Sequence, residues 1–136
     1  MNRNWRNIRT AITAVLILII AIQFLAAMWG SIQLSFANDQ TQIFCEMTTG
    51  AEQALAQEPP NIKSALGFLE YIVNYYPSGT KQTVGSTLDT IVERSRSLAE
   101  ARIIEKLRAE TGKDFGAKAE DWLRGLTAAP PVDDGN

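Results

Sequence analysis

The sequence predicts an all-α protein with one N-terminal transmembrane helix, followed by a small helical-hairpin domain with a short C-terminal helix. Three observations support this fold class. No charged residue occurs from Thr10 to Asn38. Further along the chain, apolar residues recur every three or four positions, which is the period of one face of an α-helix. No segment of convincing length alternates apolar and polar residues, as a half-buried strand would.

The uncharged segment has the length of a membrane span. A helix that crosses a bilayer core of about 30 Å needs about 20 mainly apolar residues, and residues 11–29 meet this requirement. Three arginines precede the segment, whereas the first basic residue after it is Lys63. The positive-inside rule therefore predicts a cytoplasmic N-terminus at residues 1–9, a single span at residues 10–32 and an extracytoplasmic remainder, in a cell membrane.

A cleaved signal peptide is the alternative interpretation of the same segment. Ser35-Phe36-Ala37 has small residues at the spacing that signal peptidase requires. Cleavage at Ala37 would release a small secreted helical protein. The apolar run is longer than the roughly 7–15 residues of a signal-peptide core, which favours an uncleaved signal-anchor. Both interpretations place residues 38–136 outside the cytoplasm.

Residues 33–58 are expected to form a juxtamembrane helical stalk. Its apolar positions follow a helical period: Ile43, Met47, Ala51 and Ala54 or Leu55. The stalk either continues the membrane helix or begins afresh near Asp39. Pro59-Pro60 ends it, because the residue before a proline avoids the α region.

Residues 59–126 are expected to form the helical domain. Its first helix, at 61–76, has an apolar stripe at Ile62, Ala65, Leu66, Leu69, Ile72, Val73 and Tyr76. Pro77-Ser78-Gly79 stops this helix. The second helix, at 81–111, is expected to bury Val84, Leu88, Ile91, Val92, Leu98, Ala99 and Ile103. Its charges are expected to face water in pairs such as Arg96–Glu100, and Gly112 is its expected C-cap.

The last element is a short helix within residues 113–124, bracketed by Phe115 and Trp122. These two aromatic side chains are expected to form a structural lid over the open end of the helix pair. Beyond it, residues 127–136 have the composition of a disordered tail.

The segment Leu107-Arg-Ala-Glu-Thr-Gly-Lys-Asp-Phe-Gly116, followed by Trp122, resembles the C-terminal tail of bacterial HEAT-like α-helical repeat proteins. The middle segment, residues 71–81, is similar to short membrane-anchored bacterial proteins of unknown function. The resemblance implies a helical interaction domain in which Phe115 and Trp122 close a helical layer. A repeat array needs about three units, and the sequence contains only one such helix–turn–helix unit.

The composition argues against several functional classes. There is no histidine, which removes the commonest metal ligand and general base. We therefore expect no enzymatic activity, no catalytic residues, no metal and no cofactor. The net charge is −2 despite the three N-terminal arginines, so the acidic remainder argues against nucleic acid as a partner. Ser78-Gly79-Thr80-Lys81 lacks the preceding strand and the glycine spacing of a phosphate loop, and no small-molecule substrate is evident.

Two features are candidates for interaction. Tyr71, Tyr75 and Tyr76 cluster at the end of one predicted helix, and tyrosines are enriched at interfaces, although they also pack at ordinary helix ends. Cys45 is the single cysteine, so it either pairs between chains or is a buried apolar residue.

The leading hypothesis is a non-enzymatic single-pass membrane protein whose extracytoplasmic helical domain binds another envelope protein, or itself as a homodimer. The partners are then membrane lipid and protein. The alternatives are the secreted product of cleavage at Ala37 and a structural stalk subunit of an envelope complex, which sustained heptads after the span would favour.

Overall fold

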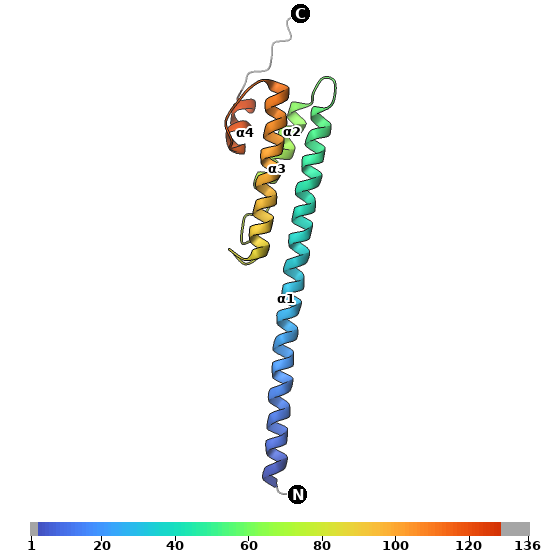
Figure 1. Cartoon of the computed structure of the whole chain (residues 1–136), viewed down its shortest axis with the longest axis vertical. Coiled ribbons are helices and arrows are strands. Elements are labelled where there is room, and N and C mark those ends of the chain that lie inside the picture. Colours follow the sequence, from blue (N-terminus) through green and yellow to red (C-terminus); the bar gives the residue numbers. More distant parts are fainter. Residues whose placement is uncertain (1–2, 129–136) are drawn as a thin grey trace, which may run out of the picture. The chain divides into compact units, whose positions relative to one another are not determined.

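The structure, a computed structural model, describes residues 3–128, and that part of the chain contains four α-helices and no strand (Figure 1). The helices are α1 (Arg3–Leu55), α2 (Ile62–Asn74), α3 (Thr87–Thr111) and α4 (Ala119–Thr127). The predicted all-α fold class is therefore confirmed. The expected tail at 127–136 lies, from residue 129 onward, outside the described residues.

The chain divides into two compact units, Met1–Ser35 and Phe36–Asn136. In the first unit, the described residues belong to α1, and the large apolar side chains of the predicted span are exposed, among them Ile17 (62%) and Leu25 (64%). Within residues 3–128, α1 is the one helix that is long and apolar enough to cross a membrane. A membrane anchor and a signal sequence share this property, because both need an uninterrupted apolar helix.

α1 continues without a break to Leu55. Of the two possibilities left open by the sequence, continuation of the first helix is therefore correct, and a fresh start near Asp39 is not. The helix ends just before the two prolines, and the Ala56 N–H donates the last helical bond to the Glu52 carbonyl at 2.9 Å.

The second unit contains the C-terminal part of α1 together with α2, α3 and α4. α2 runs back along α1, because the Asn61 N–H at its start bonds the Ala54 carbonyl while Tyr75 at its end contacts Phe44. α3 then runs in the direction of α1, and α4 packs against α2 and α3 (Figure 1).

The core of this unit is formed by one face of each helix. Its largest fully buried side chains are Phe44 from α1, Leu69 and Ile72 from α2, Val92, Ile103 and Leu107 from α3, and Trp122 from α4. The stripe predicted for residues 61–76 is confirmed at Ala65, Leu66, Leu69 and Ile72, which are all buried. The helix stops two residues earlier than expected, and its N-cap is the Asn61 carboxamide, which accepts a hydrogen bond from the Ser64 N–H at 3.0 Å.

The expected start of the next helix at residue 81 is wrong, because α3 begins at Thr87. Gly85 adopts a φ of 73°, a left-handed conformation that a continuing α-helix cannot contain. Ser86 then caps the helix, because its hydroxyl accepts a bond from the Asp89 N–H at 3.2 Å. The expected C-cap is confirmed at Gly112, which has a φ of 65°.

The expected buried face of α3 is confirmed in part. Val92, Ala99 and Ile103 are buried as expected, whereas Ile91 and Leu98 are 50% and 64% exposed and Val84 lies outside the helix. The buried residues follow a stripe with offsets of three and four, which consists of Asp89, Val92, Arg96, Ala99, Ile103 and Leu107. Two polar residues belong to this stripe, and the reason for their burial lies in the contacts they make.

Candidate interaction surface

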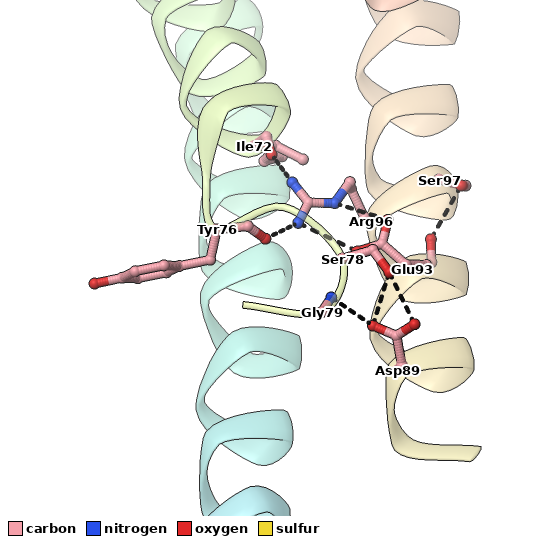
Figure 2. A network of polar contacts seen from close by, with 8 residues as sticks. All are labelled: Ile72, Tyr76, Ser78, Gly79, Asp89, Glu93, Arg96 and Ser97. Atoms are coloured by element: carbon pink, nitrogen blue, oxygen red, sulfur yellow. Dashed lines mark hydrogen bonds and ion pairs between the residues drawn. The ribbon is translucent and has the colours of Figure 1, made fainter. Parts of the chain in front are cut away.

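Arg96 closes the C-terminal end of α2. Its side chain is buried, and its guanidinium donates to the carbonyls of Ile72 and Tyr76, both at 2.6 Å (Figure 2). Its Nε lies 3.3 Å from a carboxylate oxygen of Glu93. Carbonyls at a helix C-terminus have few intrahelical partners. The arginine satisfies the Tyr76 carbonyl and adds to the 3.4 Å bond that the Ile72 carbonyl accepts from the Tyr75 N–H. The expectation that Arg96 faces water is therefore wrong.

Asp89 holds the loop between α2 and α3 (Figure 2). Its carboxylate accepts hydrogen bonds from the Ser78 hydroxyl at 2.8 Å and from the N–H groups of Gly79 and Gly85 at 3.1 and 2.9 Å. The Gly85 bond, and then the Ser78 bond, favour the ionised form and lower the pKa of Asp89, although burial opposes this. Because the Gly79 amide already donates to a carboxylate, it is not presented to a phosphate.

The three tyrosines of the sequence prediction form one continuous aromatic surface, here called the tyrosine face. The ring centroids of Tyr71 and Tyr75 lie 5.3 Å apart, and those of Tyr75 and Tyr76 lie 4.8 Å apart at an interplanar angle of 83°. Tyr75 also meets the ring of the buried Phe44 edge to face, with the centroids 6.0 Å apart. Tyr71 and Tyr76 remain 47% and 42% exposed, so the face is anchored in the core at its centre and open at both ends.

The position of Tyr76 depends on Arg96. Tyr76 has a φ of 29°, which is unfavourable for a residue with a Cβ. Its carbonyl is turned toward Arg96 while its ring points away from that network (Figure 2). Strained backbone persists where the surrounding contacts over-determine it. The buried arginine therefore fixes the direction in which the exposed ring projects.

A hollow of about 420 Å³ lies beside the tyrosine face. Its aromatic walls come from Phe36, Tyr75 and Tyr76, and its carboxylates come from Asp39 and Glu46 on α1. The Nζ of Lys81 lies 4.7 Å from the Phe36 ring centroid and 4.3 Å from that of Tyr76. Aromatic faces and carboxylates both attract cations, so the hollow suits a positively charged or aromatic group, and the chain places its own lysine there.

This packing also affects the pKa of the Tyr75 phenol. Burial raises its pKa, and the neighbouring Tyr71, Tyr76 and Asp39 raise it further. Tyr75 therefore remains a neutral phenol that can donate and accept hydrogen bonds in the lining of the hollow.

The sequence did not indicate Phe36 or Lys81 as neighbours of the tyrosines. The contact of Lys81 with the Phe36 ring joins the loop after α2 to α1, and the two residues are far apart in the sequence.

Cys45 is exposed on α1, so the alternative of a buried apolar cysteine is wrong. It lines a separate hollow between α1 and α3, and not the one beside the tyrosine face. Across residues 3–128, no group of three or more histidine, cysteine, aspartate or glutamate side chains is arranged to hold a metal ion.

The segment 107–116 and Trp122, which carry the resemblance to the HEAT-like proteins, are joined by a connected set of contacts. Trp122 is fully buried and meets Phe115 edge to face, with the ring centroids 5.2 Å apart. The Trp122 indole N–H donates to the Gly116 carbonyl at 2.8 Å, and Arg108 donates to the same carbonyl at 3.2 Å. The Asp114 carboxylate accepts hydrogen bonds from the Arg108 guanidinium and from the Gly116 N–H, both at 2.9 Å. The aromatic pair thus packs α4 against the segment between α3 and α4, and the polar residues Arg108 and Asp114 hold the turn of that segment at Gly116.

Comparison of the chain with protein-family models, with curated proteins and with solved structures finds no match.

Proposed function

We propose that this chain is a non-enzymatic single-pass membrane protein whose extracytoplasmic helical domain binds another protein of the cell envelope through the tyrosine face. The observation that carries the proposal is the pair of exposed tyrosine rings held by buried contacts beside an aromatic and acidic hollow. Rigid aromatic side chains contribute binding area at a low cost in conformational entropy. The carboxylates of Asp39 and Glu46 favour a partner surface with basic side chains.

The position of Ala37 favours an anchor over a cleaved signal peptide. Ala37 is 4% exposed and lies in the helical part of the second unit, which begins at Phe36. Cleavage at Ala37 would separate Phe36 from Lys81, which contacts its ring. An uncleaved α1 keeps both residues in the domain.

We also propose that the domain is related to the HEAT-like class through its C-terminal segment. The support is that its tryptophan, phenylalanine, aspartate and arginine form one connected set of contacts. Because these four residues contact one another, a helical domain that uses this packing would need all of them. The contacts support a role in packing for these residues.

An exposed position outside the hollows provides a test of the topology. In the Cys45→Ser background, Lys113→Cys, at an exposed position after α3, should be labelled by a membrane-impermeant maleimide in spheroplasts, and Cys45→Ser alone should remain unlabelled. N-terminal sequencing of the same material should find Met1 or Asn2 and not Asn38. Labelling only after lysis would contradict the orientation, and a chain that begins at Asn38 would establish the secreted form.

The tyrosine face is tested by proximity labelling from the full chain in its own membrane. The double variant Tyr71→Ala, Tyr76→Asn removes both exposed rings, and asparagine tolerates the left-handed backbone at position 76. We expect loss of the labelled partner. The control is Arg94→Ala, Glu105→Ala, which changes two exposed positions on α3. Equal labelling by both double variants would refute the proposed face.

A further inference from the structure

α3 presents an apolar ridge to solvent. Ile91 and Leu98 are 50% and 64% exposed, and their spacing of seven residues places them on one side of the helix, two turns apart. Leu88 and Ser95, partly buried, continue the same side toward the core. The ridge was expected inside the protein on sequence grounds, and the fold leaves it without cover among the described residues.

A groove runs beside this ridge. It is a hollow of about 400 Å³ between α1 and α3, lined by Thr41, Cys45 and Thr48 from α1 and by Ser95 and Leu98 from α3, among others. Leu98 belongs to both features, so the ridge meets the groove at this residue. The α1 wall includes the short side chains of Thr41, Cys45, Thr48 and Thr49 beside those of Phe44 and Glu52, and the short ones leave room for an apolar side chain to enter.

The groove carries no net charge. Its two charged lining residues are Glu52 and Arg102, and the Arg102 Nε lies 2.5 Å from a Glu52 carboxylate oxygen. Because this pair neutralises itself, two identical copies of the surface do not repel each other. A surface of this kind requires no partner of opposite charge.

We propose that a second copy of this chain covers the surface, with the Ile91/Leu98 ridge of each copy seated in the groove of the other. An isologous interface needs one patch that contains both complementary shapes, and here the ridge and the groove are adjacent. The proposal rests on the proposed membrane anchoring, because two copies inserted through α1 enter the bilayer in the same direction. Two such copies that form an isologous pair are related by a two-fold axis normal to the membrane.

The test uses the full chain in lipid nanodiscs or detergent micelles, with its mass determined by light scattering. Ile91→Glu, Leu98→Glu places two charges on the ridge. The matched control, Thr90→Glu, Ser97→Glu, adds the same two charges one residue earlier, at exposed positions of the same helix outside the ridge. Removing two central anchors of an interface costs about tenfold or more in affinity, so the ridge variant should be monomeric under conditions in which the control and the wild type are dimers.

A second measurement uses the native thiol in the groove. A flexible bismaleimide should cross-link wild-type and control chains through Cys45 and should fail with the ridge variant, while circular dichroism shows all three to be folded. A monomeric wild type, or equal cross-linking of ridge and control variants, would overturn the proposal. Carbonate extraction of the same membranes reports on anchoring separately, and loss of the dimer with the partner labelling of the tyrosine face intact would leave the proposed function standing.

Discussion

Replacing Arg96 by alanine should destabilise the domain more than any change of a surface charge. The substitution removes two short hydrogen bonds to the carbonyls of Ile72 and Tyr76. It also removes the ion pair with Glu93 and the contact with the Phe44 ring, whose centroid lies 5.0 Å from the guanidinium carbon. The two hydrogen bonds connect α3 to α2 and to the residue Tyr76 after it, and the ring contact connects α3 to α1. The ion pair with Glu93 lies within α3.

The expected loss follows from these contacts. Hydrogen bonds to a charged group contribute roughly 1.5–3 kcal/mol each, and a partly desolvated cation–π contact adds about 0.5–2 kcal/mol. Part of the free energy lost with these contacts is recovered in the variant. The Ile72 carbonyl keeps a hydrogen bond from the Tyr75 N–H at 3.4 Å, and the Tyr76 carbonyl can bind water. We therefore expect a loss of about 3 kcal/mol in the free energy of unfolding, or about a hundredfold in the folding equilibrium.

The assay is urea unfolding of the full chain in detergent, followed by the fluorescence of Trp122. Of the three tryptophans, Trp5 and Trp29 are replaced by phenylalanine, so that only the buried indole of α4 reports. Arg94→Ala is the control, because Arg94 is exposed on the same helix and should change stability by less than about 0.5 kcal/mol. Arg96→Lys should recover less than half of the loss, because one ammonium lacks the fork that reaches two carbonyls.

Two results would refute this reasoning. If Arg96→Ala and Arg94→Ala unfold at the same urea concentration, the buried guanidinium does not hold α2. If Arg96→Lys behaves as the wild type, charge alone is sufficient and the two-carbonyl geometry is not required.

Three further changes test other contacts, each by the same unfolding assay. Gly67→Ala should stabilise the domain by roughly 0.5–1 kcal/mol, because Gly67 lies in the interior of α2 with nothing within 4 Å of an added Cβ; a loss of stability would contradict this. Gly125→Ala should destabilise it by about 1–3 kcal/mol, because the new methyl would collide with the Phe115 ring; an unchanged midpoint would show that the ring moves freely. The lowered pKa of Asp89 stabilises the fold above the unfolded value, so stability should fall as pH drops below about 4. Asp89→Asn should reduce that acid dependence, and an identical pH profile would contradict the role of the carboxylate.

The parts of the fold that follow from local rules were predictable from the sequence. The stripe of α2 has clean offsets of three and four, and its burial at Leu69 and Ile72 follows directly. Gly112 is a glycine after a long helical period, and it adopts the left-handed C-cap conformation that such a position favours. Phe115 and Trp122 meet, but only Trp122 lies in the short helix, because α4 begins at Ala119 and Phe115 belongs to the segment before it.

The predicted start of α3 is wrong, and its predicted buried face is correct only in part, for different reasons. A local signal for the start was present: Ser86 is followed three residues later by the acidic Asp89, which is the pattern of a helix N-terminus. The choice of the buried face of α3 had no comparable local signal in the sequence. Two stripes of similar spacing compete on this helix, and the more apolar one contains Ile91 and Leu98. The other is buried because the carbonyls at the end of α2 require Arg96, which is a requirement of tertiary structure.

The tyrosine cluster was predicted, but its surroundings were not. Phe44 is fully buried beneath Tyr75, whereas the helical period read from the sequence passed through Ile43 and Met47. The neighbouring positions of a continuous apolar segment cannot be ranked without knowing how α1 is rotated toward α2. For the same reason, the contact between Lys81 and Phe36 could not be inferred from residues 45 positions apart.

The proposed dimer depends energetically on the proposed anchor. Burying an aliphatic side chain contributes roughly 1.5–3 kcal/mol, and the four half-exposed ridge side chains of two copies would together contribute roughly 3–7 kcal/mol on that scale. Association of freely diffusing molecules costs an estimated 4–15 kcal/mol, so this ridge alone is a weak interface in solution. Copies that share a membrane encounter each other at a raised effective concentration and in a common orientation. A modest ridge is then sufficient, and the same surface on a secreted domain would leave it monomeric.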